Sequence, residues 1–145
     1  MKKTLTIVAV SVVTYVVVMG PSCRQSPERA SAVAGGNQSI AAAVQSQARG
    51  VQVEGEGTVI KLLEDDIQGS RHQRILLRLA SGGTLLVAHN IDLAPRVEGL
   101  REGETLQFYG EFDWNEKGGV VHWTHHDPGA RYVAGWIRYK GRRYQ

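Results

Sequence analysis

Five histidines are the residues whose type and spacing could do chemistry: His72, His89, His122, His125 and His126. Three of them fall in one string that ends in an aspartate, and imidazole and carboxylate groups are good ligands for zinc and other transition metals. The string predicts metal ligands at His122, His125, His126 and Asp127. On a strand, His122 and His126 would share a face about 13 Å apart, at roughly 3.3 Å per residue. A single divalent ion would therefore need a donor from another strand, for which His72 and His89 are the candidates.

Two further strings combine arginine, histidine and acidic or amide side chains, namely Arg71 to Arg74 and His89 to Arg96. A neutral imidazole beside aspartate or arginine can carry a proton during hydrolysis, and guanidinium groups bind anions. The ligand-binding residues predicted from these strings are Arg71, His72, Arg74, His89, Asn90, Asp92 and Arg96.

Three interpretations of these residues remain open. The histidines can be structural and bind the ends of loops, they can hold a metal ion, or they can do acid–base catalysis. A metal-dependent hydrolase, for example of phosphodiesters, would combine His72, His89, His122 and Asp127 with Arg71 and Arg74 as clamps for the anion. The chain contains no Gly-Xaa-Ser-Xaa-Gly motif, phosphate-cradling glycine loop or paired cysteine motif.

The elements that must position these residues are strands. After Gly50 the apolar residues alternate, and the pattern predicts strands over 51–63, 72–80, 84–89, 104–114 and 119–125. A segment with Pro95 and room for a helical turn separates the third strand from the fourth. This order is typical of a small five-stranded OB-like barrel, although an SH3-like barrel or a lipid-binding sandwich would show similar spacing. Residues 135–144 are expected to add a short hairpin, so the predicted fold is all-β.

Alternation also sorts the side chains by face. On the second strand Ile75, Leu77 and Leu79 should point into the core while Arg74 and Arg78 point outward. On the fourth strand the core positions are Leu106, Phe108, Phe112 and Trp114, and the outward positions are Gln107, Tyr109, Glu111 and Asp113. The outward sheet surface is where OB barrels commonly bind extended polymers or peptides.

The first 49 residues differ from the rest. Lys2 and Lys3 followed by an uncharged apolar run over 5–19 are typical of a secretory signal, which we expect over residues 1–23. The single cysteine, Cys23, stands where a lipoprotein signal places its acceptor thiol, although the residues before it are unusual for such a site. Residues 24–49 are rich in small and polar residues and are expected to be a flexible linker to a domain over 50–145. We therefore expect export to the periplasm and attachment to a membrane through this lipid or the signal.

The charge of the chain does not indicate a nucleic-acid partner. The net charge of +3 comes from the N-terminal part, and the domain from Gly50 onward is nearly neutral. A basic C-terminal segment containing Arg131, Arg138, Lys140, Arg142 and Arg143 could contact phosphates or lipid headgroups, or simply be solvated. We expect a monomer whose ligand is unknown and could be anionic.

The three strings 69–74, 88–96 and 122–128 resemble a family of short bacterial proteins known as domain of unknown function family 3465. The likeness covers Gly55 to Gln145, and it implies family membership without an activity, a substrate or a catalytic residue. In the family pattern a histidine often follows the arginine that stands here as Arg131, where this chain has Tyr132, and an aromatic residue often stands at Ile75. A site that needed that histidine would be incomplete in this chain.

Together these features predict a non-enzymatic binding module of the cell envelope, with the metal-dependent hydrolase as the alternative. We also expect the three strings to come together at one rim of the sheet structure, because each lies at a strand end.

Overall fold

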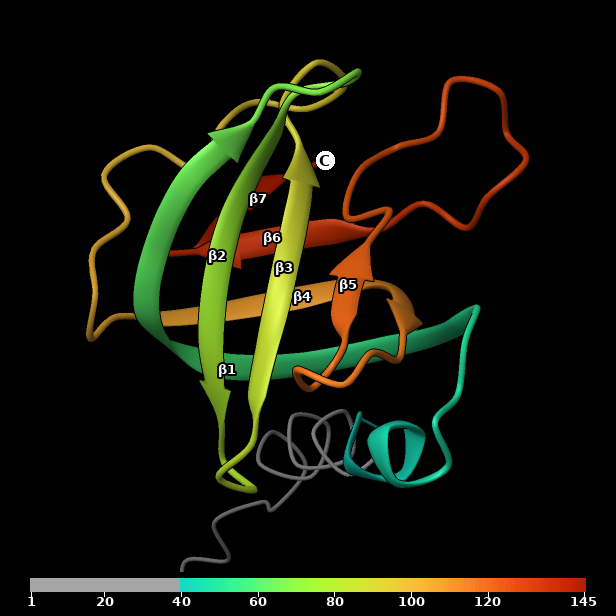
Figure 1. The fold of residues 1–145 in the computed structure, drawn as a ribbon. Coiled ribbons are helices and arrows are strands. Elements are labelled where there is room, and N and C mark those ends of the chain that lie inside the picture. Colours follow the sequence, from blue (N-terminus) through green and yellow to red (C-terminus); the bar gives the residue numbers. More distant parts are fainter. Residues whose placement is uncertain (1–39) are drawn as a thin grey trace, which may run out of the picture.

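The computed structural model describes residues 40–145, which form seven strands and one short helix (Figure 1). The strands are β1 Val51–Asp66, β2 His72–Leu79, β3 Thr84–Asn90, β4 Thr105–Asp113, β5 Val120–His122, β6 Trp136–Tyr139 and β7 Arg142–Tyr144.

Five of the strands close into a ring in the order β1-β2-β3-β5-β4, with β4 pairing back to β1. All pairs in the ring are antiparallel except β3 and β5, which run parallel. The predicted all-β, OB-like arrangement of five strands is confirmed. The added hairpin is confirmed as well, because β6 pairs with β7 and also lies against β4.

The first strand can serve two neighbours because it bends at Gly57. Residues before Gly57 pair with β4 and residues after Thr58 pair with β2, while Gly57 and Thr58 each have a partner on both neighbouring strands. A Cβ atom at Gly57 would lie 3.0 Å from the Arg78 carbonyl oxygen and 3.0 Å from Leu77 Cβ. Glycine is therefore needed at this crowded bend, as expected for a strongly curved strand.

The core fills the ring with inward side chains at alternate positions. Ile75, Leu77 and Leu79 of β2 are buried, as are Leu106, Phe108 and Phe112 of β4. This agrees with the faces predicted from alternation, while Trp114 packs at the edge and is only partly buried. The hairpin is held to the ring by Tyr139, whose hydroxyl donates to the Glu104 carboxylate and lies 3.0 Å from the Gly99 carbonyl oxygen.

The segment directly before β1 differs from the flexible linker expected over residues 24–49. Residues 40–45 are helical, and Ile40 and Ala43 are buried in the same core as the sheet residues. The Trp114 N–H donates to the Ala48 carbonyl at 2.9 Å, which ties the segment to the end of β4. This end of the segment therefore packs against the core through Ile40 and Ala43. Removal of residues 1–49 should therefore destabilise the protein.

The proposed signal, Cys23 and most of the expected linker lie outside the described residues. Within residues 40–145, no helix is long and apolar enough to cross a membrane.

Strand β5 is shorter than predicted. It ends at His122 because Trp123 adopts a left-handed backbone conformation with φ of 52°. His125 and His126 therefore lie in the loop that leads to β6 rather than on a strand, so strand spacing does not govern their positions.

Candidate functional site

The three histidine-containing strings meet at one rim of the ring, as expected. The Ile91 N–H donates to the Arg71 carbonyl at 2.9 Å, which joins the start of β2 to the end of β3. The ring of His89 bonds to the Thr124 hydroxyl at 2.9 Å, which joins the end of β3 to the loop after β5. Figure 1 shows these three strand ends at the same side of the molecule.

His89 is the centre of this rim, and its side chain is fully buried. Its Nε2 lies 3.1 Å from the Pro95 carbonyl, which can only accept, so Nε2 carries the proton and donates it there. Its Nδ1 must then accept from the Thr124 hydroxyl. Burial lowers the pKa of His89 to about 4, against the opposing effect of the hydrogen bond to Pro95. The imidazole is neutral with both nitrogens occupied, so it offers no free atom to a metal or substrate.

Other predicted ligand-binding residues are occupied by contacts within the rim. Asp92 accepts from the backbone N–H of Arg71 and from its Nε, both at 2.7 Å, and these bonds hold the pKa of the carboxyl below its usual range. Asn90 accepts the Asp92 N–H at 2.9 Å. His72 Nδ1 donates to the Ser70 carbonyl at 2.8 Å, and Arg96 pairs with Asp65.

The structure does not bring the predicted metal ligands His122, His125, His126 and Asp127 together as one set. His125 is buried and its Nδ1 donates to the His126 carbonyl at 2.8 Å, while the His126 side chain is exposed. Asp127 accepts the backbone N–H groups of Gly129, Arg131 and Tyr132, which lower the pKa of its carboxyl. These three hydrogen bonds show that Asp127 holds the loop after β5 in its conformation.

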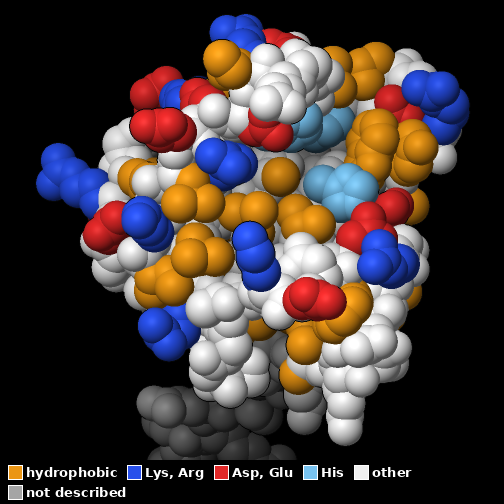
Figure 2. All heavy atoms as spheres, in the orientation of Figure 1, with side chains coloured by type: hydrophobic (Ala, Val, Ile, Leu, Met, Phe, Trp, Pro, Cys, Tyr) orange, Lys and Arg blue, Asp and Glu red, His pale blue; other side chains and the backbone are white. Residues whose placement is uncertain are grey.

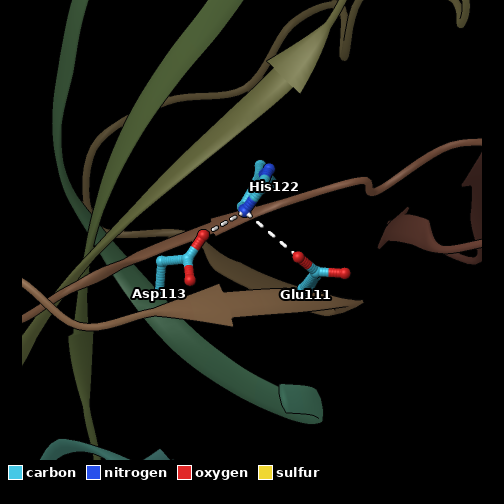
Figure 3. Close-up of side chains that lie close together, drawn as sticks. All are labelled: Glu111, Asp113 and His122. Carbon is cyan, nitrogen blue, oxygen red and sulfur yellow. Dashed lines mark hydrogen bonds and ion pairs between the residues drawn. The ribbon is translucent and has the colours of Figure 1, made fainter. Parts of the chain in front are cut away.

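His122 instead joins two carboxylates of the neighbouring strand (Figure 3). Its Nε2 lies 2.7 Å from Asp113 Oδ2 and 3.9 Å from Glu111 Oε1. In residues 40–145, these three side chains are the one set of three potential metal ligands whose donor atoms all lie within 4.8 Å of one another. All three are half-buried, so the group faces solvent at the surface of the ring.

The backbones of β4, β5 and Gly50 hold Glu111, Asp113 and His122 in place. A Cβ atom at Gly110 would lie 2.4 Å from the His122 carbonyl oxygen, so β5 approaches β4 at this point. Asp113 Oδ1 accepts the Gly50 N–H at 3.0 Å. Partial burial opposes ionisation of Asp113, but the hydrogen bonds from His122 and Gly50 outweigh it and lower the pKa of the carboxyl.

The alternation of side chains along the fourth strand placed Glu111 and Asp113 on the outward face, but the histidine string pointed to other residues as ligands. A signal for them existed. Two carboxylates two residues apart share a face of one strand, and the OB order places the fifth strand, with His122, beside the fourth.

A second feature is a groove of about 350 Å³ on the outward face of β2 and β3. Its floor is aliphatic, formed by Leu63, Leu76 and Leu86, and it is lined further by Arg74, Thr84, Asn115, Lys117 and Gly119. Figure 2 shows hydrophobic side chains gathered across this side of the molecule, with lysine and arginine around them. Turn 115–118 between β4 and β5 forms one wall, as a loop does in ligand-binding OB barrels.

The cations at this groove have no carboxylate partner among residues 40–145. Arg74 Nε donates to the Glu64 carbonyl at 2.7 Å, which fixes the side chain beside Leu63 without neutralising its charge. Lys117 likewise takes part in none of the ion pairs of that part of the chain. Of the three arginines predicted to bind a ligand, Arg74 is thus the one that forms no ion pair among residues 40–145.

Comparison with known proteins gives the chain a family. No curated protein matches it. One family profile matches residues 19–145, which is most of the chain and includes all three histidine strings and the whole ring. The chain therefore belongs to the family described as protein of unknown function DUF3465.

Proposed function

We propose that this protein is a binding module of the cell envelope whose groove on β2 and β3 takes an acidic polypeptide segment with apolar side chains. The observation that carries the proposal is the aliphatic floor flanked by Arg74 and Lys117, two cations without carboxylate partners in residues 40–145. An apolar side chain can leave water on this floor while a neighbouring carboxylate binds a guanidinium or ammonium group.

The side chains of this face favour a peptide over a nucleic acid. OB folds that bind single strands stack bases on aromatic side chains. The outward positions of β2 and β3 beside the groove are aliphatic, basic or small, namely Arg74, Leu76, Arg78, Thr84, Leu86 and Ala88, and the one imidazole on this face of β2 is His72 at its first residue. An extended peptide with alternating apolar and acidic side chains matches the aliphatic floor and the two cations of this face.

The envelope location rests on the N-terminal sequence. Lys2, Lys3 and the apolar run over 5–19 support export, and the position of Cys23 supports a lipid anchor. Attached in this way, the module would present its groove to proteins of the envelope.

Binding is tested with the full chain and a fluorescent ten-residue peptide of alternating leucine and glutamate. We expect a Kd in the micromolar range and a loss of at least about tenfold in Arg74→Glu and in Lys117→Glu, because each reversal opposes an anionic ligand. The matched control is Arg142→Glu on β7, which should bind as the wild type does. A peptide with lysine in place of glutamate should not bind. Equal binding of both peptides, or equal weakening by the control, would contradict the proposal.

The anchor is tested separately in a bacterial host. Cys23→Ser should move the protein from the membrane fraction to the soluble fraction, and mass spectrometry should find lipid on the wild-type cysteine alone. An unmodified thiol with unchanged fractionation would rule out the lipid anchor and leave the groove proposal standing.

The alternative of a metal-dependent hydrolase built from His72, His89, His122 and Asp127 has less support. Both ring nitrogens of His89 are occupied, and Asp127 is committed to three backbone N–H groups. Zinc-dependent cleavage of bis-p-nitrophenyl phosphate that is lost in His89→Gln and Asp127→Asn would favour the hydrolase.

A further inference from the structure

We infer that Glu111, Asp113 and His122 form a binding site for a divalent transition-metal ion of the zinc type. The site involves none of the residues that line the β2–β3 groove, so it stands or falls independently of the peptide-binding proposal.

Strand register brings the three side chains together. Glu111 and His122 are directly paired across the antiparallel β4–β5 ladder, where facing Cβ atoms lie about 5 Å apart. Asp113 is two residues along β4 and therefore points to the same face as Glu111. Figure 3 shows the imidazole of His122 directed between the two carboxylates. The convergence is thus fixed by the backbone rather than by chance contacts of long side chains.

The donor spacing is close to what such an ion requires. With bonds of about 2.0 to 2.2 Å, the ligands of a tetrahedral or octahedral ion lie roughly 3 to 3.5 Å apart. Here His122 Nε2 lies 2.7 Å from the nearest Asp113 oxygen and 3.9 Å from the nearest Glu111 oxygen. Side-chain shifts of about 1 Å bring all three donors to bonding distance of a common point, with the ion replacing the hydrogen bond between His122 and Asp113.

The hydrogen bonds and ion pairs of Asp113 and Glu111 also leave these carboxylates suited to bind a cation. The Gly50 N–H holds Asp113 Oδ1 and thereby leaves Oδ2 directed at His122. Glu111 takes part in one ion pair among residues 40–145, the 3.9 Å contact with His122, although four-fifths of its side chain is buried. Two ionised carboxylates held beside one imidazole are balanced by a charge of +2, and an orienting hydrogen bond on a ligating carboxylate is typical of metal sites.

The donor set determines which ion is expected. Imidazole nitrogen with carboxylate oxygen suits zinc, nickel and copper, whereas magnesium and calcium prefer oxygen alone. Three protein donors at a partly exposed position leave room for water or for a ligand atom in the remaining coordination positions.

The test is zinc titration of the full chain, made without a polyhistidine tag and freed of metal by chelation. We expect one ion per chain with a Kd below about 10 μM and a rise in Tm of at least about 4 °C in 100 μM zinc. Magnesium at millimolar concentration should neither bind nor compete. In Glu111→Gln and Asp113→Asn, zinc affinity should fall by at least about tenfold.

Matched control variants separate this site from the other polar groups. His126→Gln and Glu116→Gln remove an exposed imidazole and an exposed carboxylate elsewhere, and both should bind zinc like the wild type. Because Asp113 also holds Gly50, its variant could fold poorly, so Glu111→Gln with a normal Tm in chelator is the deciding variant. The inference is overturned if the wild type binds no zinc below 10 μM, if Glu111→Gln binds as tightly as the wild type, or if His126→Gln is the variant that loses binding.

Discussion

The histidine-rich rim and the outward surface of the sheet differ in where their polar groups find partners. At the rim, His89 and Asp127 are buried, and each makes two or more hydrogen bonds to the chain itself. On the outward surface, Arg74 and Lys117 lack carboxylate partners in residues 40–145, and Glu111 has one distant contact. A buried polar group must be satisfied within the protein, whereas an exposed group can be left for a ligand. The rim should therefore determine stability and the surface should determine binding.

The largest expected effect is at Gly135, where the loop from the rim rejoins the sheet. A Cβ atom there would lie 2.0 Å from the Trp123 carbonyl oxygen and 2.5 Å from that of Tyr109, both of which are backbone. Gly135→Ala should destabilise the protein by about 5 kcal/mol or prevent folding. Gly83→Ala is the control, since nothing lies within 4 Å of its Cβ position, and it should unfold in urea like the wild type. Equal stability of the two variants would contradict the close packing of the loop.

His89→Ala should cost about 4 kcal/mol, because it opens a cavity in the core and leaves the Thr124 hydroxyl and the Pro95 carbonyl without their partner. Denaturant unfolding of purified protein measures this directly. If the free energy of unfolding fell by less than about 1 kcal/mol, the stability of the rim would not depend on the hydrogen bonds of His89. The rim would then not differ from the outward surface in its effect on stability.

Acid should weaken the protein through the same residue. The pKa of His89 is about 4 in the folded protein and 6.5 in the unfolded chain. Below pH 6.5 the unfolded chain therefore binds a proton at this residue that the folded protein does not bind. Stability is fully present above pH 6.5, falls as the pH drops toward 4, and loses about 3 kcal/mol from this group over that window. Urea unfolding at pH 7 and pH 4.5 should show the loss in the wild type and a smaller one in His89→Gln. The same slope in both would assign the pH dependence to another group.

The smallest effect is expected on the outward surface. Arg74→Ala and Lys117→Ala should change stability by no more than about 0.5 kcal/mol, because these side chains lie at the surface and pair with no carboxylate in the described part of the chain. Thermal unfolding measures both variants. A cost above about 2 kcal/mol for either would show that the cation is structural and would weaken its assignment to a ligand.

The sequence by itself determined the approximate strands and most of their inward faces, because alternation of apolar residues and the spacing of turns are local properties. The order of these elements is typical of an OB-like ring, but an SH3-like barrel or a sandwich has similar spacing, so the strand pairing was decided by the tertiary structure. It also identified the family strings and their meeting at one rim, since each string lies at the beginning or the end of a strand. The docking of residues 40–48 was missed, because the segment carries few large apolar residues and only Ile40 and Ala43 of it are buried in the core.

Only the tertiary structure decided the role of each polar residue. The string 122–127 looked like one set of ligands, but the left-handed backbone at Trp123 ends the strand there. His122 therefore stays on β5 beside the carboxylates of β4, while His125 lies in the following loop. The burial of His89 and the exposure of Arg74 likewise depend on what packs beside them from distant segments. A histidine or arginine has the same chemistry at the rim and on the outward surface. Its availability to a ligand depends on the groups that hydrogen-bond to it from segments distant in sequence, and a local sequence pattern does not contain that information.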